Sequence, residues 1–354
     1  MEELETTPKE IPFSEVITAL LNNNQPFPAV MMPSLSDISE KNLESLIKVW
    51  GQIADQRRIG LMEDMHEIQD QDTISNFSSI AEFALDDPLA PVRTLAISML
   101  WEWPNKETAR RLLSIIENDD DMQVRASACN GLGNYVYLAE LDEFSSSLAD
   151  QIVDTLLRVI KSDAPKLVRR RALEAVSFSS REDVAPLIEA AFRNPDREWM
   201  MSALFAMGRS CDECWTDQVM SCLNHAVPEV QFEAVRSAGE LEIEDAREIL
   251  IELLEDYQNL DDDVRIAAVV ALSKIGGENV RATLETLVEE VTDEDEAEII
   301  STSLENLDFL ELGILPGMLD LDQFNLGRHS SEEDDDSEEF EEWDEDLDEE
   351  EDED

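Results

Sequence analysis

Basic residues are scarce in this chain of 354 residues, and their scarcity excludes two classes of ligand. The chain has 26 Lys and Arg against 84 Asp and Glu, a formal net charge of −58. The last 23 residues hold 19 acids and no base, so the rest of the chain still carries −39. Nucleic acids and anionic lipids are bound through clustered Lys and Arg. We therefore expect no binding to nucleic acid and none to a membrane.

Long apolar runs and cysteines are few as well. No run approaches the ~18–20 apolar residues of a membrane helix, and the opening MEELETTPKE has neither the basic nor the apolar region of a secretory signal. Four cysteines are too few for a disulfide framework in a chain of this length. We expect a cytoplasmic protein with reduced thiols, and we expect it to be a monomer.

What the sequence does contain is a repeat. Six segments share an apolar anchor residue, an alanine four residues later and another apolar residue eight later, a spacing that marks one face of a helix. The anchors are Val92, Val124, Val168, Trp199, Val230 and Val264. A second apolar stripe of helical spacing lies upstream, and a turn rich in Asp, Asn and Pro separates the two stripes. The unit is thus a helical hairpin of about 32 residues.

This hairpin resembles HEAT repeats of the short bacterial kind, which also occur in phycobilin-lyase subunits. The resemblance is carried by the Asp-rich turn, a Val-Arg pair at the anchor and the alanine that follows. The pair occurs at Val92-Arg93, Val124-Arg125, Val168-Arg169 and Val264-Arg265, but not at Trp199-Met200 and Val230-Gln231. The resemblance implies an all-α fold, a right-handed, armadillo-like α-solenoid of about eight hairpins. It also implies an Asp–Arg ladder between turns, interrupted at the two exceptional units.

The chain divides into four regions by composition. We expect an N-terminal capping segment at 1–39, the HEAT-like solenoid at 40–312, a linker at 313–329 and a disordered acidic tail at 330–354. Three roles for the tail remain open. It could keep the protein soluble, capture a basic partner through Phe340, Trp343 and Leu347, or fold back onto Arg170 and Arg171.

The segment CDECWTDQVMSCLNH has cysteine and histidine spacings that suggest zinc. Cys211 and Cys214 precede a predicted helix, and Cys222 lies eight residues beyond Cys214 on it, a span of ~12 Å. That is too far for shared tetrahedral coordination, so we predict no metal and a buried Cys222. A redox role for Cys211 and Cys214 stays open, because thiol pKa values fall near helix N-termini.

Sequence motifs of catalysis are missing. GxSxG, a P-loop, HExxH and GxGxxG do not occur, and Asp320-Leu-Asp322 lacks the remainder of a calcium loop. We therefore expect no enzymatic activity and no cofactor.

Protein binding has better support. Positions two and six residues after the anchor are predicted to point away from the core, onto the concave surface that solenoids use for extended ligands. In three consecutive units they are apolar or arginine: Met201, Phe205, Phe232, Arg236, Ile266 and Val270. The alternative is that tight curvature, or the C-terminal segment, buries them.

The function we predict is a non-catalytic scaffold or adaptor that binds a protein in its groove. One alternative is an assembly factor or chaperone whose acidic tail shields a basic client. Another is an accessory subunit of a cofactor-attachment system like the phycobilin lyases. The partner is not identified by the sequence.

Overall fold

The computed structural model describes residues 11–71, 74–257 and 259–311, and within these ranges every regular element is a helix. The linker and the acidic tail predicted at 313–329 and 330–354 lie outside the described residues.

Eight helical hairpins follow one another along the described chain, which confirms the predicted number. Helix α1 (Phe13–Leu21) and the 3-10 helix η1 (Ala29–Ser34) precede them. The hairpins are α2 (Glu40–Trp50) with α3 (Asp55–Gln71), α4 (Ser78–Ala84) with α5 (Ala90–Met99), α6 (Lys106–Asn118) with α7 (Met122–Glu140), α8 (Ser146–Ile160) with α9 (Lys166–Val176), α10 (Ala185–Phe192) with α11 (Arg197–Arg209), α12 (Thr216–Cys222) with α13 (Pro228–Glu240), α14 (Arg247–Glu255) with α15 (Asp262–Ile275), and α16 (Val280–Glu290) with α17 (Glu294–Glu311). The 3-10 turns η2 (Glu213–Trp215) and η3 (Glu244–Ala246) lead into α12 and α14.

The turns begin the second helices by capping them. The side chains of Asp121, Asp196 and Asp261 accept hydrogen bonds from backbone N–H groups in the first turns of α7, α11 and α15. Such N-caps stabilise a helix by about 1 kcal/mol each. The predicted role of the Asp-rich turns is therefore confirmed at these three hairpins.

The anchor stripe forms the core. Five of the six anchors are fully buried and the sixth, Trp199, is 5% exposed. The alanines four residues later have no exposed surface at all. These small side chains let the second helix of each hairpin approach its neighbours.

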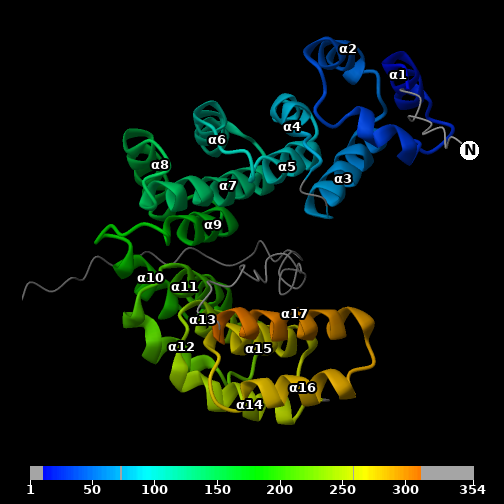
Figure 1. Cartoon of the computed structure of the whole chain (residues 1–354). Helices are drawn as coiled ribbons and strands as arrows, with labels where there is room; N and C mark the ends of the chain where they lie inside the picture. Colours follow the sequence, from blue (N-terminus) through cyan, green and yellow to red (C-terminus); the bar gives the residue numbers. More distant parts are fainter. Residues whose placement is uncertain (1–10, 72–73, 258, 312–354) are drawn as a thin grey trace, which may run out of the picture.

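The second helices lie along the inner side of the curved array, with the first helices outside (Figure 1). Three glycines nine residues after an anchor meet a small residue of the next second helix. A Cβ on Gly239 would lie 2.7 Å from the Cα of Ala271, and one on Gly208 would lie 2.9 Å from the Oγ of Ser237. Gly133 makes the same approach to Ala175 at 3.2 Å. Since only glycine fits at such separations, these contacts bring the second helices unusually close.

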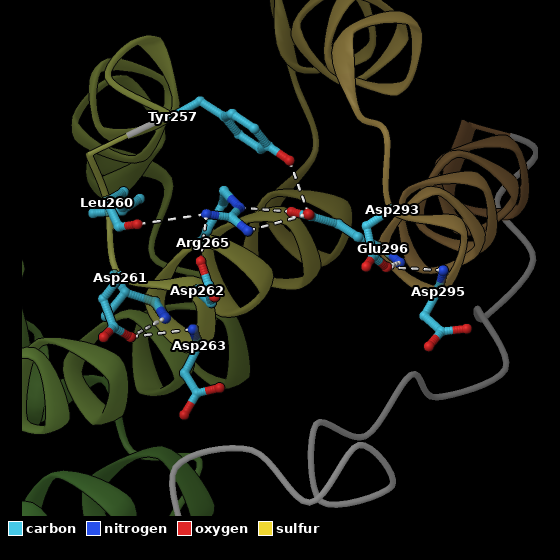
Figure 2. Close-up of polar contacts among 10 residues, drawn as sticks. Tyr257, Leu260, Asp261, Asp262, Asp263, Arg265, Asp293, Asp295 and Glu296 are labelled. Carbon is cyan, nitrogen blue, oxygen red and sulfur yellow. Dashed lines mark hydrogen bonds and ion pairs between the residues drawn. The ribbon is translucent and has the colours of Figure 1, made fainter.

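Ion pairs join some of the turns as the predicted ladder requires. Arg93 pairs with Asp119 at 2.7 Å, and Arg265 pairs at 2.6 Å with Glu296 at the start of α17. Figure 2 shows Arg265 between Glu296 and the carbonyl of Leu260, with Tyr257 donating its hydroxyl to Glu296 at 2.8 Å.

In the middle of the array, the residues after the anchors also bond within their own hairpins. Arg125 and Arg169 donate Nε to carbonyl oxygens of their own hairpins, those of Ile116 and Ile160. Gln231, one of the two exceptions in the sequence, donates in the same way to the carbonyl of Leu223 at 2.8 Å. Glutamine thus replaces arginine here without loss of the hydrogen bond.

Candidate protein-binding face

Aromatic and arginine side chains stack in a row across four consecutive second helices. The rings of Tyr137 and Phe178 are 5.3 Å apart, and the guanidinium of Arg209 lies 5.0 Å from the Phe178 ring. Arg209 also lies 4.6 Å from the ring of Phe205, whose centre is 4.1 Å from the guanidinium of Arg236. We call these five residues the Arg–aromatic strip. Each such cation–π contact contributes about 0.5–2 kcal/mol, more as it loses water.

The hairpin geometry explains why these residues meet. The two helices of each hairpin run in opposite directions and the hairpins stack in one orientation, so all second helices run the same way and their C-terminal ends lie along one edge of the array. Tyr137 is in the last turn of α7, Phe178 is two residues beyond α9, and Arg209 is the last residue of α11. Phe205 stands four residues before Arg209, one helical turn away on the same face. The strip therefore follows this edge of the inner face.

Helices α9 and α11 beside the strip are basic in an otherwise acidic protein. Together they hold six Lys or Arg and only two Glu. Figure 1 places both in the middle of the inner side of the array. The two helices therefore carry a net positive charge, but apart from Arg209 their basic residues lie in their N-terminal halves. There Lys166 pairs with Asp196, Arg170 is buried beside Glu198, and Arg171 pairs with Glu174.

A buried network joins these two helices. Arg171 pairs with Glu174 at 2.6 Å, and the hydroxyl of Ser202 donates to Glu174 at 2.6 Å. Arg170 donates to the same hydroxyl at 2.9 Å and lies 3.4 Å from Glu198. Burial raises the pKa of Glu174, but the charges of Arg171 and Arg170 and the Ser202 hydrogen bond outweigh it, so that the pKa lies below its ordinary value. Glu174 is thus held ionised, and α9 and α11 are fixed in position.

Beside the strip, a hollow of about 160 Å³ opens between α5, α7 and α9. Its lining includes Trp101, Asn130 and Arg171. Trp101 and Trp103, just beyond α5, are 36% and 38% exposed, which is high for such large apolar side chains. The aromatic character of this edge therefore extends into the N-terminal half of the array.

The six binding candidates predicted from the sequence divide into two sets. Phe205 and Arg236 lie face to face within the strip but are only 7% and 4% exposed. Met201, Phe232 and Val270 are 8%, 4% and 1% exposed and belong to the hydrophobic core. The prediction that the six side chains stand on an open surface is therefore wrong for both sets, and Ile266 alone among them is half-buried. The physical reason is that α11, α13 and α15 lie very close together. Each of these helices therefore buries its side against the next one, which is the outcome expected from tight curvature.

Tyr137, Phe178 and Arg209 were missed by sequence reasoning. Phe178 and Arg209 both stand ten residues after their anchors, and the same position in the next two units holds Glu240 and Lys274, which pair at 2.7 Å. This row at position ten was the available signal. Positions two and six after the anchor do not contain it.

The cysteine motif does not form a site. Cys222 is 5% exposed in the apolar stripe of α12, as predicted, and the Nδ1 of His225 accepts a hydrogen bond from the backbone of Val227. No three His, Cys, Asp or Glu side chains in the described ranges are grouped so as to hold a metal ion.

The thiols of Cys211 and Cys214 are exposed, but their pKa values are raised rather than lowered. Partial desolvation and the charges of Glu240 and Glu242 raise the pKa of Cys211, and desolvation and Asp212 raise that of Cys214 to about 11. The expectation of a lowered pKa at this helix start is wrong, because nearby carboxylates disfavour the thiolate.

Comparisons with known proteins agree with the repeat. Residues 216–307 match the family model for HEAT repeats. Among solved structures, the chain is similar to the YibA protein of Escherichia coli, with 18% identity, 79% of this chain and 96% of that chain covered, and a TM-score of 0.41. It is also similar to a chain of the complex of CpcE and CpcF of phycocyanin lyase from Nostoc, with 19% identity, coverage of 65% and 94%, and a TM-score of 0.43. Human deoxyhypusine hydroxylase is similar over 84% of this chain and 96% of its own, with 15% identity and a TM-score of 0.34.

No match was found among curated protein sequences. In the part of the chain that the structure describes, no helix has the length and apolar character needed to cross a membrane. Residues 216–307 span the last three hairpins almost entirely, and helical hairpins continue back to α2. Residues 216–307 are therefore identified as HEAT repeats, within a longer array of helical hairpins.

Proposed function

We propose that this protein is a non-catalytic scaffold that binds a protein partner along its inner face, at the Arg–aromatic strip. The observation that supports this most is the strip itself. Arginine and aromatic residues are enriched where binding energy concentrates in protein interfaces. Three hairpins contribute the accessible members of the strip, Tyr137, Phe178 and Arg209, while Phe205 and Arg236 support them from beneath. Solenoids expose such extended inner surfaces to ligands of matching length.

The chemistry of the strip favours an acidic partner segment that carries aromatic or aliphatic side chains. Helices α9 and α11 supply six basic residues against two acidic ones, while the rings of Tyr137 and Phe178 supply apolar contact. The strongly acidic remainder of the molecule would repel such a segment elsewhere, which restricts it to this face.

The test compares partners captured by the full-length protein and by an Arg209→Glu variant, identified by mass spectrometry. We expect the variant to lose at least one partner. Arg158→Glu is the matched control, because Arg158 on the first helix α8 is 63% exposed and its charge change is the same. An identical set of partners for all three proteins would contradict the proposal. A partner that instead requires the acidic tail would favour the alternative function, a chaperone for a basic client.

A further inference from the structure

The most acidic segment of this protein belongs to the same chain as the two net-basic helices α9 and α11. Residues 332–354 contain 19 Asp or Glu and no Lys or Arg, interrupted by Phe340, Trp343 and Leu347. The tail thus combines acidic groups with aromatic and aliphatic side chains. The Arg–aromatic strip and helix α9 favour a segment of this composition. Elsewhere the body of the protein is strongly negative and repels such a segment.

We infer that the acidic tail, residues 332–354, binds in cis to the Arg–aromatic strip and α9, and thereby competes with acidic partners for the inner face. This inference rests on the proposed function, since it regulates the same surface. The occupant of the strip is the chain's own tail, and a separate partner protein would compete with it.

The tail is long enough to reach. Helix α17 ends at Glu311, on the same edge of the array as the C-terminal ends of α9 and α11. Three hairpin spacings of ~10 Å separate α17 from α11, a distance of roughly 30 Å. The 20 residues from 312 to 331 can span up to about 65 Å when extended. The tail can therefore reach α11, and α9 one hairpin further, without strain.

Tethering makes even weak binding effective. A segment joined by a short flexible linker has an effective concentration of about 1 mM at its site. A tail with an intrinsic Kd of about 100 µM would then occupy the strip about 90% of the time and weaken a competitor about tenfold. The contacts are ionic and partly exposed, so salt weakens them.

The experiment uses full-length protein and a labelled synthetic peptide of residues 332–354. The wild type is compared with an amide-tail variant, in which the 19 acids of 332–354 are replaced by Asn or Gln while the chain length and the aromatic residues are kept. Fluorescence anisotropy measures peptide binding to each. We expect the peptide to bind the amide-tail variant about tenfold more tightly than the wild type, whose own tail occupies the strip, and the difference to shrink in about 0.5 M salt.

Adding Arg209→Gln to the amide-tail variant should weaken peptide binding about fivefold, whereas adding Arg158→Gln should leave it unchanged. Circular dichroism verifies that both remain folded. Equal affinity for the wild type and the amide-tail variant, or equal losses from the two arginine changes, would overturn the inference. This outcome is distinguishable from failure of the proposed function, because the peptide experiment involves no partner. If the strip binds the peptide but Arg209→Glu loses no partner, the proposed function alone would be refuted.

Discussion

Replacing Gly239 by alanine should force two second helices of the inner face apart. A Cβ at this position would lie 2.7 Å from the Cα of Ala271 and 2.8 Å from its Cβ. Carbon atoms separate optimally at about 3.5–4.0 Å, so α13 and α15 would have to move by roughly 1 Å. The atoms in the way are backbone and Cβ, which cannot rotate aside.

The magnitude is the difference of two opposing terms. Overpacking in a well-packed core costs typically 1–3 kcal/mol. Alanine in a helix interior is favoured over glycine by about 0.5–1 kcal/mol. We therefore expect the Gly239→Ala protein to be less stable by about 1–2 kcal/mol, with the loss concentrated in α13 and α15.

Native-state hydrogen exchange is the suitable assay, because it resolves the free energy of opening of individual helices in a repeat array. The matched control is Gly60→Ala in α3, where the nearest atom to the added Cβ is the flexible Oε2 of Glu63 at 4.0 Å. The free energy of unfolding of Gly60→Ala should equal that of the wild type or exceed it by up to about 1 kcal/mol. If Gly239→Ala proves as stable as Gly60→Ala, the close approach of the second helices is not the constraint that we infer.

Two further predictions concern charge and thiol chemistry. Glu174→Gln should lower the free energy of unfolding in urea by about 3 kcal/mol, because it leaves the two arginines of α9 without their buried carboxylate. Since folding lowers the pKa of Glu174, its stabilisation is present above the ordinary carboxyl pKa and is lost as pH falls below it. The difference in unfolding free energy between the wild type and the variant should therefore become smaller in acid. A difference that stays constant down to about pH 3 would contradict a lowered pKa of Glu174. With a thiol reagent, Cys211 and Cys214 should react in the folded protein and Cys129 and Cys222 only on unfolding. The rate for Cys214 should still be rising above pH 9, because its pKa is raised to about 11; a plateau near neutral pH would refute a raised pKa.

Local sequence was sufficient to predict the repeat and its turns. The anchors and the alanines four residues after them recur in phase, and a helix buries residues at that spacing whatever its neighbours do. The buried alanines and the Asp caps follow directly from this local pattern. Most anchors lie 31–34 residues apart, but Val124 and Val168 are 44 apart, and the sequence does not tell whether the extra residues lengthen a loop or a helix. The structure assigns part of this interval to α7, which continues to Glu140.

The binding face depended on contacts between hairpins, which a single-repeat pattern does not contain. Whether Met201 or Phe232 is exposed is decided by how closely the next second helix approaches, and that distance is set by pairs such as Gly208 with Ser237, 29 residues apart in sequence. In the same way, Phe205 meets Arg236 and Arg209 meets Phe178 only because successive hairpins stack in register. The sequence thus determined which residues form each hairpin and that the molecule is a solenoid. Only the tertiary structure decided which side chains share its inner face, because that is a property of the spacing between repeats.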